Sequence, residues 1–384
     1  MKKIFSTLFV VLLTAALFAG GGKESKMSYK AGTYTASAQG MNGEVNVSVT
    51  FSNSALKKIE IGTHKETPGI SDAAIEKMPL RIVEKQSLAV DTVSGATISS
   101  KAILMAVEKT LIAAGADIAA WKSPLKTKQT KGTFVKKKSD VVVIGAGAAG
   151  VAAALSAHDK GAKVILLEKM PSIGGTTATS QGLIGGFESK YTKALNVHYS
   201  FEQMYANLMN NASYRLDPAL AGITVKNSGE IINWLNERFS MPFKDEVLVG
   251  YGPLQMMHQV ENMGSGVKSA MEATLKKSGI TLMLETRANE ILMDESGNVR
   301  GVKASSGANT IVIYADSVII ASGGYSNNPA LSTLLDPEKR GVMSIGFAGA
   351  TGDGLIMASN VGAALTHTDH MMCVLKDYEI MAEH

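Results

Sequence analysis

Three glycines at fixed spacing follow an apolar run near the middle of the chain. Gly145, Gly147 and Gly150 form the pattern G-x-G-x-x-G directly after residues 140–144. The first glycine permits a tight turn, the second lets a pyrophosphate approach the backbone, and the third lets a helix pack closely on the strand. Glu168 ends the next apolar run, where its carboxylate can accept hydrogen bonds from ribose hydroxyls. Together these residues predict a dinucleotide-binding site.

A second candidate phosphate site lies earlier in the chain, at Ser94-Gly95-Ala96-Thr97. A helix is expected to begin just after Thr97, so that free N–H groups and the positive end of the helix dipole can hold a phosphate dianion. Gly95 and Ala96 leave room for the backbone to approach the ligand closely. Such a segment is also common in ordinary loops, so composition alone leaves this site open.

Residues 30–117 are predicted to form a domain of the α+β class around this second site. Residues 43–51 alternate apolar and polar side chains, which is typical of a half-buried strand. The helix beyond Thr97 carries apolar residues at a spacing of four from Ile103 to Leu111 and is expected to stop at Gly115. The expected elements are strands at 32–38, 43–51 and 56–61, and helices that begin near Ser71 and near Ser99 or Ser100.

The remainder of the chain, residues 139–384, is predicted to be an α/β domain. An apolar strand at 140–144, a small-residue helix at 148–160 and a strand at 163–167 open a doubly wound, three-layer fold of the Rossmann type. Residues 118–138 are rich in lysine and are expected to form a basic linker between the domains. A solvated run is favoured there over contact with anionic headgroups.

Composition and charge exclude several classes of protein. Hydrophobic residues make up 45% of the 384 residues and charged residues 19%, which is typical of a globular chain. The formal net charge of +4 gives no reason to expect a nucleic-acid partner. The single cysteine, Cys373, excludes an intrachain disulfide and a C-x-x-C-H haem attachment. No metal site is predicted.

Residues 1–22 are predicted to be a signal peptide. Lys2 and Lys3 precede an apolar run at 4–18, and small residues follow it. The run is too short for a comfortable membrane span. Gly21 stands where a lipoprotein would carry its lipidated cysteine, which does not favour a lipid anchor. The chain is therefore expected to be exported, to the periplasm or the outer face of the cytoplasmic membrane.

Further segments accompany the glycine pattern: E-K-x-x-x-x-G-G-T at 168–176, A-S-G-G at 321–324 and G-A-T-G-D-G at 349–354. As a set, from about residue 139 to 366, they resemble the flavoprotein family of fumarate reductases, succinate dehydrogenases and urocanate reductases. The resemblance implies FAD rather than NAD, and the absence of a second G-x-G-x-x-G gives no reason to expect an NAD(P)H site. The FAD contacts that it implies are Gly145, Gly147, Ala149, Gly150, Glu168, Lys169, Gly174, Gly175, Thr176, Gly182, Gly323, Gly324 and Asp353.

The segment that ends at Thr97, together with His64-Lys65-Glu66-Thr67-Pro68-Gly69, resembles FMN-binding modules such as the FMN-carrying subunits of sodium-pumping quinone reductases. In that family a dedicated flavin transferase esterifies the last threonine with the FMN phosphate. The resemblance therefore implies a covalent FMN on Thr97, a maturation partner, and FMN contacts from Ser94, Gly95, Ala96 and His64.

The resemblance implies reduction of a carbon–carbon double bond conjugated to a carboxylate, as in fumarate or urocanate. FMN would pass electrons from a membrane donor, a quinol or a cytochrome, to FAD, and FAD would pass hydride to a small unsaturated acid. Two alternatives stay open: a flavin-loaded electron carrier without substrate chemistry, and a dehydrogenase that runs the same reaction in reverse.

The catalytic residues are expected beyond His384, since the chain resembles only the front part of the family's FAD and substrate-capping domains. The first substrate histidine of the family would fall near Val374. The local candidates are His367, Asp369 and His370, for which a surface loop is favoured over substrate or metal contact. His198 and His258 are expected to be structural, and Met263-Gly264-Ser265-Gly266 a loop near the flavin, before a helix that ends near Lys277.

Overall fold

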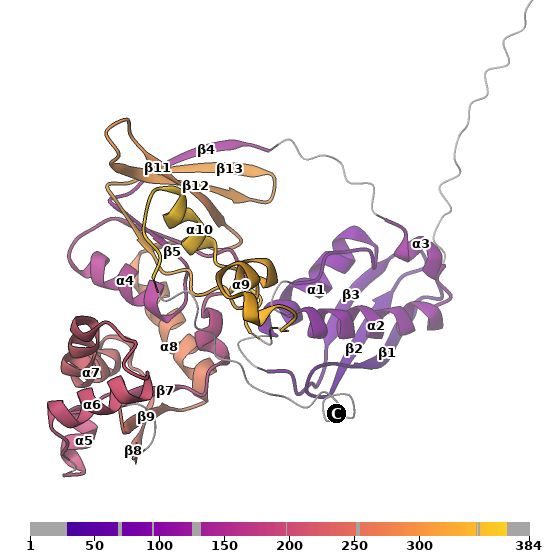
Figure 1. The fold of residues 1–384 in the computed structure, drawn as a ribbon. Coiled ribbons are helices and arrows are strands. Elements are labelled where there is room, and N and C mark those ends of the chain that lie inside the picture. The colour runs from indigo at the N-terminus through magenta and orange to yellow at the C-terminus, as the bar shows by residue number, and fades with distance from the viewer. Residues whose placement is uncertain are drawn as a thin grey trace, which may run out of the picture.

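Two domains joined by a single connection make up the described part of the chain, as the computed structural model shows (Figure 1). The structure describes residues 29–67, 71–93, 96–124, 132–196, 198–250, 254–342, 344 and 346–366. The predicted signal peptide at 1–22 lies outside these residues. Within them, no helix combines the length and apolar character that crossing a membrane requires.

The first domain is an antiparallel sheet in the order β1-β2-β3, packed against two helices. Strands β1 and β2 pair from Gly32↔Phe51 to Gln39↔Glu44, which is the predicted hairpin. Val45, Val47 and Val49 of β2 are buried because alternate side chains of a strand share one face. The elements are β1 (Gly32–Gln39), β2 (Glu44–Phe51), β3 (Leu56–Ile61), α1 (Asp72–Lys85), α2 (Thr97–Ala113) and α3 (Ile118–Lys122).

Helix α2 begins at Thr97, two to three residues before the predicted start at Ser99 or Ser100. Neither serine caps the helix, because both hydroxyls have other partners. Ser99 donates to the carboxylate of Glu66, and the Ser100 Oγ accepts a hydrogen bond from the Val93 N–H at 3.0 Å. The predicted end is confirmed, since the helix stops at Ala113 and Gly115 follows with a φ of +82°.

The second domain is built on a parallel sheet in the order β10-β6-β5-β14. Its central strand β5 is entirely apolar, as a strand that is covered on both faces requires. The strand–glycine–helix–strand order predicted from residue 139 onward is confirmed. The elements are β5 (Val141–Ile144), α4 (Ala148–Asp159), β6 (Val164–Leu167), β10 (Thr281–Met283) and β14 (Ser317–Ile320).

Three layers are present, but a second sheet covers one face of the parallel sheet. Val143 of β5 packs with α4, α7 and α8, whereas Val142 and Ile144 pack with the sheet β11-β12-β13-β4 and with Met357 of α10. A three-layer α/β domain is thus confirmed, with helices mainly on one side. The elements are α7 (Pro218–Phe239), α8 (Met263–Ser278), β4 (Phe134–Lys138), β11 (Arg287–Met293), β12 (Val299–Ser306), β13 (Asn309–Tyr314) and α10 (Asp353–Asn360).

The segment expected as a linker, 118–138, contains regular structure at both of its described ends. Trp121 of α3 is buried in the first domain, where its indole N–H donates to the Tyr29 hydroxyl at 3.2 Å. Strand β4 pairs in parallel with β13 of the second domain. The sequence pattern did not predict β4 as a strand, because three of its five residues are lysines. An edge strand tolerates such charges because much of its surface is exposed to solvent.

A small sheet in the order β7-β9-β8 and several helices complete the second domain. Met263 to Gly266 form the first turn of α8 rather than a loop before it. Glycine is needed at this turn, since a Cβ on Gly264 would lie 2.2 Å from the Thr177 carbonyl oxygen. The remaining elements are η1 (Gly175–Thr179), β7 (Leu183–Gly185), α5 (Lys190–Ala194), α6 (Phe201–Asn211), β8 (Phe243–Val249), β9 (Met256–Val260), α9 (Pro329–Leu335) and η2 (Pro337–Lys339).

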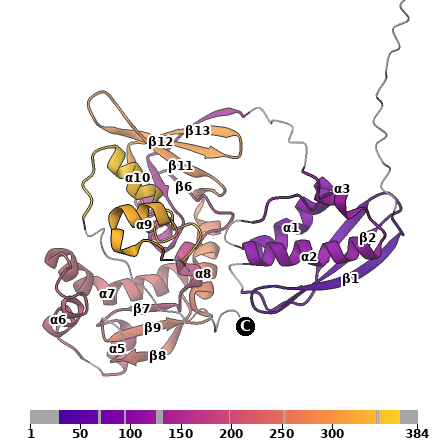
Figure 2. The same ribbon diagram turned by 45° about the vertical axis from the view of Figure 1, so that its right-hand side comes forward.

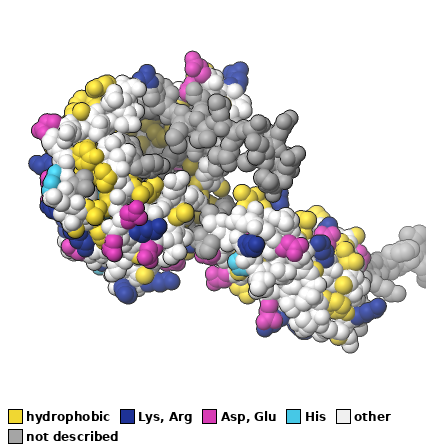
Figure 3. All heavy atoms as spheres, turned by 90° about the horizontal axis from the view of Figure 1, so that it is seen from below, with side chains coloured by type: hydrophobic (Ala, Val, Ile, Leu, Met, Phe, Trp, Pro, Cys, Tyr) yellow, Lys and Arg dark blue, Asp and Glu magenta, His cyan; other side chains and the backbone are white. Residues whose placement is uncertain are grey.

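The two domains touch along α1. In the turned view this helix lies on the side of the first domain that faces the second (Figure 2). The space-filling view shows two lobes in contact, with side chains of both charge signs interspersed on each lobe (Figure 3). Ion pairs join the lobes, among them Lys77 Nζ to Glu285 Oε2 at 3.0 Å.

Candidate cofactor sites

The glycine loop between β5 and α4 has the geometry that its sequence predicts. Gly145 has a φ of +101°, and a Cβ there would lie 2.5 Å from the Ala321 carbonyl oxygen. A Cβ on Gly150 would lie 1.7 Å from the Gly145 carbonyl oxygen, so only glycine lets α4 approach the strand. Gly147 has no such neighbour: the nearest atom to a Cβ would be the Gly174 carbonyl oxygen at 3.8 Å. Its bare backbone is therefore open to a ligand.

Glu168 lies beside this loop at the end of β6 and is 7% exposed. One carboxylate oxygen accepts a hydrogen bond from the Ala146 N–H at 2.9 Å, and the other accepts one from the Met170 N–H at 2.8 Å. Burial raises the pKa of this carboxyl, and the two backbone hydrogen bonds partly offset that effect. These bonds fix the carboxylate next to the helix start, where the sequence predicts a ribose contact.

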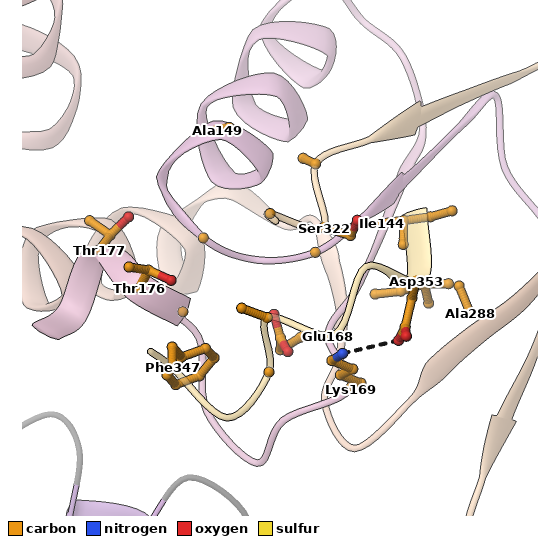
Figure 4. Close-up of a pocket in the computed structure, with 18 of the residues that line it drawn as sticks. Ile144, Ala149, Glu168, Lys169, Thr176, Thr177, Ala288, Ser322, Phe347 and Asp353 are labelled. Carbon is orange, nitrogen blue, oxygen red and sulfur yellow. Dashed lines mark hydrogen bonds and ion pairs between the residues drawn. The ribbon is translucent and has the colours of Figure 1, made fainter. Parts of the chain in front are cut away.

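A cavity of about 250 Å³ connects these elements (Figure 4). Lys169 and Asp353 lie at one end of it, and Thr176 and Thr177 of η1 lie at the other. The N-terminus of α4 borders it, which places helix N–H groups at its wall. The predicted FAD contacts that line it are Gly145, Gly147, Ala149, Glu168, Lys169, Gly175, Thr176, Gly323 and Asp353.

Four predicted contacts, Gly150, Gly174, Gly182 and Gly324, do not line this cavity. Gly150 serves helix–strand packing, and Gly174 forms a parallel bridge with Gly147 that holds the loop. Gly182 packs against the start of α8, since a Cβ there would lie 2.6 Å from the Met263 carbonyl carbon. A Cβ on Gly324 would meet nothing within 4 Å. Direct cofactor contact by these four residues stays a prediction.

Lys169 and Asp353 form a polar network at one end of the cavity. The Lys169 Nζ donates to the Asp353 Oδ2 at 3.0 Å and to the Thr351 Oγ1 at 2.5 Å, and Arg287 donates to the Asp353 Oδ1 at 2.8 Å. Burial by itself would raise the pKa of the Asp353 carboxyl. The hydrogen bonds from Lys169 and Thr351 and the charges of Lys169 and Arg287 outweigh it, so that the pKa lies below its ordinary value.

This network predicts a pH dependence of stability. A lowered pKa in the folded state means that the ionised Asp353 stabilises the fold above the ordinary carboxyl pKa of about 4, and that this contribution is lost as the pH falls through the folded-state value. We expect the difference in free energy of unfolding between the natural protein and Asp353→Asn to shrink between pH 7 and pH 3. Lys169→Met should weaken this dependence. A difference that is constant over the whole range would contradict the assignment.

Several cavity residues have no counterpart among the predicted contacts. Arg287 and Ala288 reach the cavity from β11, and Phe347 reaches it from the segment after η2. Thr177 accepts a hydrogen bond from the Ala148 N–H at 3.3 Å and thereby ties η1 to the start of α4. The position of Thr177 directly after the G-G-T segment is a signal that could have found it. For Arg287 the sequence carries none.

The second candidate site lies at the N-terminus of α2. Thr97 is the first residue of this helix and its side chain is exposed. The N-cap residue, Ala96, offers no side-chain acceptor to the first-turn N–H groups, which leaves them suited to a phosphate. His64 is exposed on the segment after β3, and the predicted contacts Ser94 and Gly95 lie outside the described residues. An exposed hydroxyl at an uncapped helix start fits a phosphate ester.

Glu66 is a buried carboxylate, 3% exposed, that ties three parts of this site together. It accepts hydrogen bonds from the Ser99 hydroxyl in the first turn of α2 and from the Asn42 N–H in the β1–β2 turn, the latter at 3.1 Å. Asn42 also donates from its side chain to the Thr67 Oγ1 at 2.8 Å. Glu66 thus positions the segment with His64 against the helix start.

Glu66→Ala should destabilise the first domain by about 1–3 kcal/mol, because it leaves the buried Ser99 hydroxyl and the Asn42 N–H without their acceptor. Chemical denaturation monitored by tryptophan fluorescence in a Trp234→Phe background, where the signal comes from Trp121 of this domain, measures the change. Glu60→Ala is the matched control, since Glu60 on β3 forms an exposed ion pair with Lys58. We expect a change there of less than about 1 kcal/mol. Equal effects of the two substitutions would show that Glu66 does not hold the site.

The histidines of the described residues do not form a metal-binding site. No group of three or more His, Cys, Asp or Glu side chains in the described ranges could hold a metal ion. His258 is fully buried, with its Nε2 2.7 Å from the Ser189 Oγ, and burial lowers its pKa. His198 lies 3.1 Å from the Asn196 side chain. The candidates His367, Asp369 and His370, and the position near Val374, fall outside the described residues.

The fold and the glycine cradle define a dinucleotide-binding α/β domain, preceded by a separate α+β domain. The family described as "FAD binding domain" matches residues 140–375, and the family described as "FMN-binding domain" matches residues 40–112. The chain therefore belongs to the FAD-binding domain family, as its resemblance to fumarate and urocanate reductases implies, and it carries an FMN-binding domain as well. Both predicted cofactors, FAD and FMN, are confirmed at the level of the domains.

Two known relatives match most of the chain, and a solved structure matches a smaller part of it. The urocanate reductase of Eggerthella lenta is 31% identical over 86% of this chain and 56% of its own length. The NADH:fumarate oxidoreductase of Klebsiella pneumoniae is 29% identical over 87% of this chain and 36% of its own length. An open conformation of a flavocytochrome c3 fumarate reductase matches at a TM-score of 0.56 and 27% identity, over 59% of this chain and 41% of that one. The chain thus spans about half or less of these proteins.

Proposed function

We propose that this protein reduces a carbon–carbon double bond conjugated to a carboxylate, as in fumarate or urocanate. The observation that carries the proposal is the presence of an FMN-binding and an FAD-binding domain on one chain that is similar to two reductases of such acids. The reaction adds one hydride and one proton across the double bond. An external donor, which we propose to be a membrane quinol or cytochrome, supplies the two electrons.

The residues of this chain hold and orient the cofactors. When bound, FAD would supply the hydride and FMN would relay electrons to FAD. The glycine loop and the α4 N-terminus would hold the diphosphate, and Glu168 would hold the ribose. The network of Lys169 and Asp353 would fix the far end of the cavity. Thr97 would carry FMN as a phosphate ester made by a flavin transferase.

Residues 1–22 would direct the chain out of the cytoplasm. Export places the site where a membrane donor can reach it. A proton donor and cations that hold the substrate carboxylate are the groups that this chemistry requires.

Anaerobic reoxidation tests the proposal. The flavin-loaded protein is reduced with dithionite, freed of excess reductant, and mixed with fumarate, urocanate or the saturated acid succinate while the flavin absorbance is followed. We expect an unsaturated acid, and not succinate, to restore the oxidised spectrum. Reoxidation by dyes or quinones alone would overturn the proposal in favour of an electron carrier without substrate chemistry.

A further inference from the structure

Helix α1 of the FMN-binding domain carries charges that match those of the FAD-binding domain. Near the C-terminal half of the helix, Lys77 Nζ lies 3.0 Å and Arg81 Nη2 3.6 Å from the carboxylate of Glu285. At its N-terminus, Asp72 Oδ2 lies 3.8 Å from Lys268 Nζ. The helix thus presents an acid at one end and bases further along, and the second domain presents the opposite charges in the same order. Such an arrangement fixes both the place and the direction of contact.

Both partners in the second domain are anchored beside the FAD cavity. Glu285 donates its N–H to the Met170 carbonyl oxygen at 3.1 Å, next to the Glu168 and Lys169 wall. Its φ of +48° is uncommon for a residue with a side chain and is held by these surroundings. The stem of Lys268 lies over the cradle, since a Cβ on Gly174 would lie 3.2 Å from its Cγ. Glu285 and Lys268, which form the ion pairs, therefore contact residues next to the FAD site.

A cavity of about 920 Å³ lies between the two domains next to these pairs. Asp91, Thr92 and Val93, which lead to the FMN helix, line one side of it, and Lys169 and Pro171 line the other. Lys169 also lines the FAD cavity, so one side chain borders both spaces. The segment that leads to Thr97 and the edge of the FAD cavity therefore border the same cavity between the domains.

We propose that α1 is the surface by which the FMN-binding domain docks for electron transfer, and that the pairs of Glu285 with Lys77 and Arg81 and of Asp72 with Lys268 set the docked geometry. This inference rests on the proposed passage of electrons between the flavins, in which reduced FMN loses two electrons and two protons and FAD gains them. Glu285 and Asp72 are half exposed, so salt screens these pairs and docking is reversible and sensitive to salt.

Zero-length cross-linking tests the docked geometry without reference to activity. A water-soluble carbodiimide joins an amine to a carboxylate only where the two groups touch. In the full chain loaded with both flavins we expect peptide mass spectrometry to find the links Lys77–Glu285 and Lys268–Asp72. Their yield should fall about tenfold between low salt and high salt. Absence of both links at low salt would overturn the proposal.

Charge reversal sharpens the test, with the Lys268–Asp72 link as the reporter. Glu285→Lys should lower the yield of this link about tenfold, because it repels Lys77 and Arg81. Lys77→Glu and Arg81→Glu, added to Glu285→Lys, should restore it. Glu290→Lys is the matched control, since Glu290 on β11 pairs with Lys303 of its own domain at 3.5 Å and should leave the link unchanged.

The same variants separate this inference from the proposed function. In stopped-flow measurements, Glu285→Lys should slow the reduction of FAD by FMN about tenfold, and the combined reversal should restore the rate. Transfer that is fast in the natural protein and equally fast in Glu285→Lys would overturn the docking proposal alone. Links without any transfer in the natural protein would instead overturn the proposed electron path.

Discussion

Thr97→Val should remove all covalently bound flavin from the protein, while FAD binding persists. Valine keeps the shape of the side chain but lacks the hydroxyl that would form the phosphate ester, so no bond can form at this position. FAD is retained because its cradle lies in the other domain, more than 40 residues further along the chain. Intact-protein mass spectrometry after co-expression with the flavin transferase measures the modification, and the absorbance of the released cofactor measures FAD.

Thr92→Val is the matched control for this substitution. Thr92 lies five residues before Thr97, outside the helix, and borders the cavity between the domains. We expect full covalent loading in this variant. Covalent flavin that persists in Thr97→Val, or that disappears equally in Thr92→Val, would show that the ester lies elsewhere.

Gly147→Ala should weaken FAD binding by about tenfold to 100-fold without unfolding the protein. The Gly147 backbone has a φ of −75°, which alanine adopts without strain, and a Cβ there would meet no atom closer than 3.8 Å. The apo fold therefore accommodates the methyl group. The methyl group would project into the space that a diphosphate needs, and overpacking of this kind costs about 1–3 kcal/mol. Titration of the apo protein with FAD measures the affinity.

Gly222→Ala provides the corresponding control on α7, far from the glycine loop in sequence. A Cβ there would lie 3.9 Å from the rings of Phe201 and Tyr205, which is ordinary contact. We expect unchanged FAD affinity and a stability that rises by up to about 1 kcal/mol, since alanine favours a helix. Unchanged affinity in Gly147→Ala as well would contradict the assignment of the phosphate cradle.

Local sequence patterns were sufficient to predict the helices and strands that carry the cofactor sites. The alternation of β2, the apolar strand β5 and the glycine spacing after it each depend on neighbouring residues, so their placement follows from periodicity and turn chemistry. The hydroxyl of Thr97 lies at a helix start for the same reason. The glycine pattern predicted Gly145, Gly147 and Glu168, and the family resemblance implied Lys169 and Asp353; all five line the FAD cavity.

Contacts between distant segments were not predictable in the same way. Strand β4 consists of Phe134, Val135 and three lysines, and it becomes a strand only because β13, far along the chain, offers it a partner. Arg287 reaches Asp353 only through the packing of β11 against α10. Glu285 belongs to no sequence motif. Its place at the contact between the domains depends on how the two domains pack together, which a local pattern does not contain.

One measurement tests the central claim that a single chain carries two flavins in two separate sites. The purified protein, produced with ample riboflavin and the flavin transferase, is precipitated with acid, and the flavin in the supernatant and in the pellet is identified and quantified. The two sites predict about one equivalent of free FAD in the supernatant and one equivalent of protein-bound FMN in the pellet. A colourless pellet, or a supernatant without FAD, would contradict it.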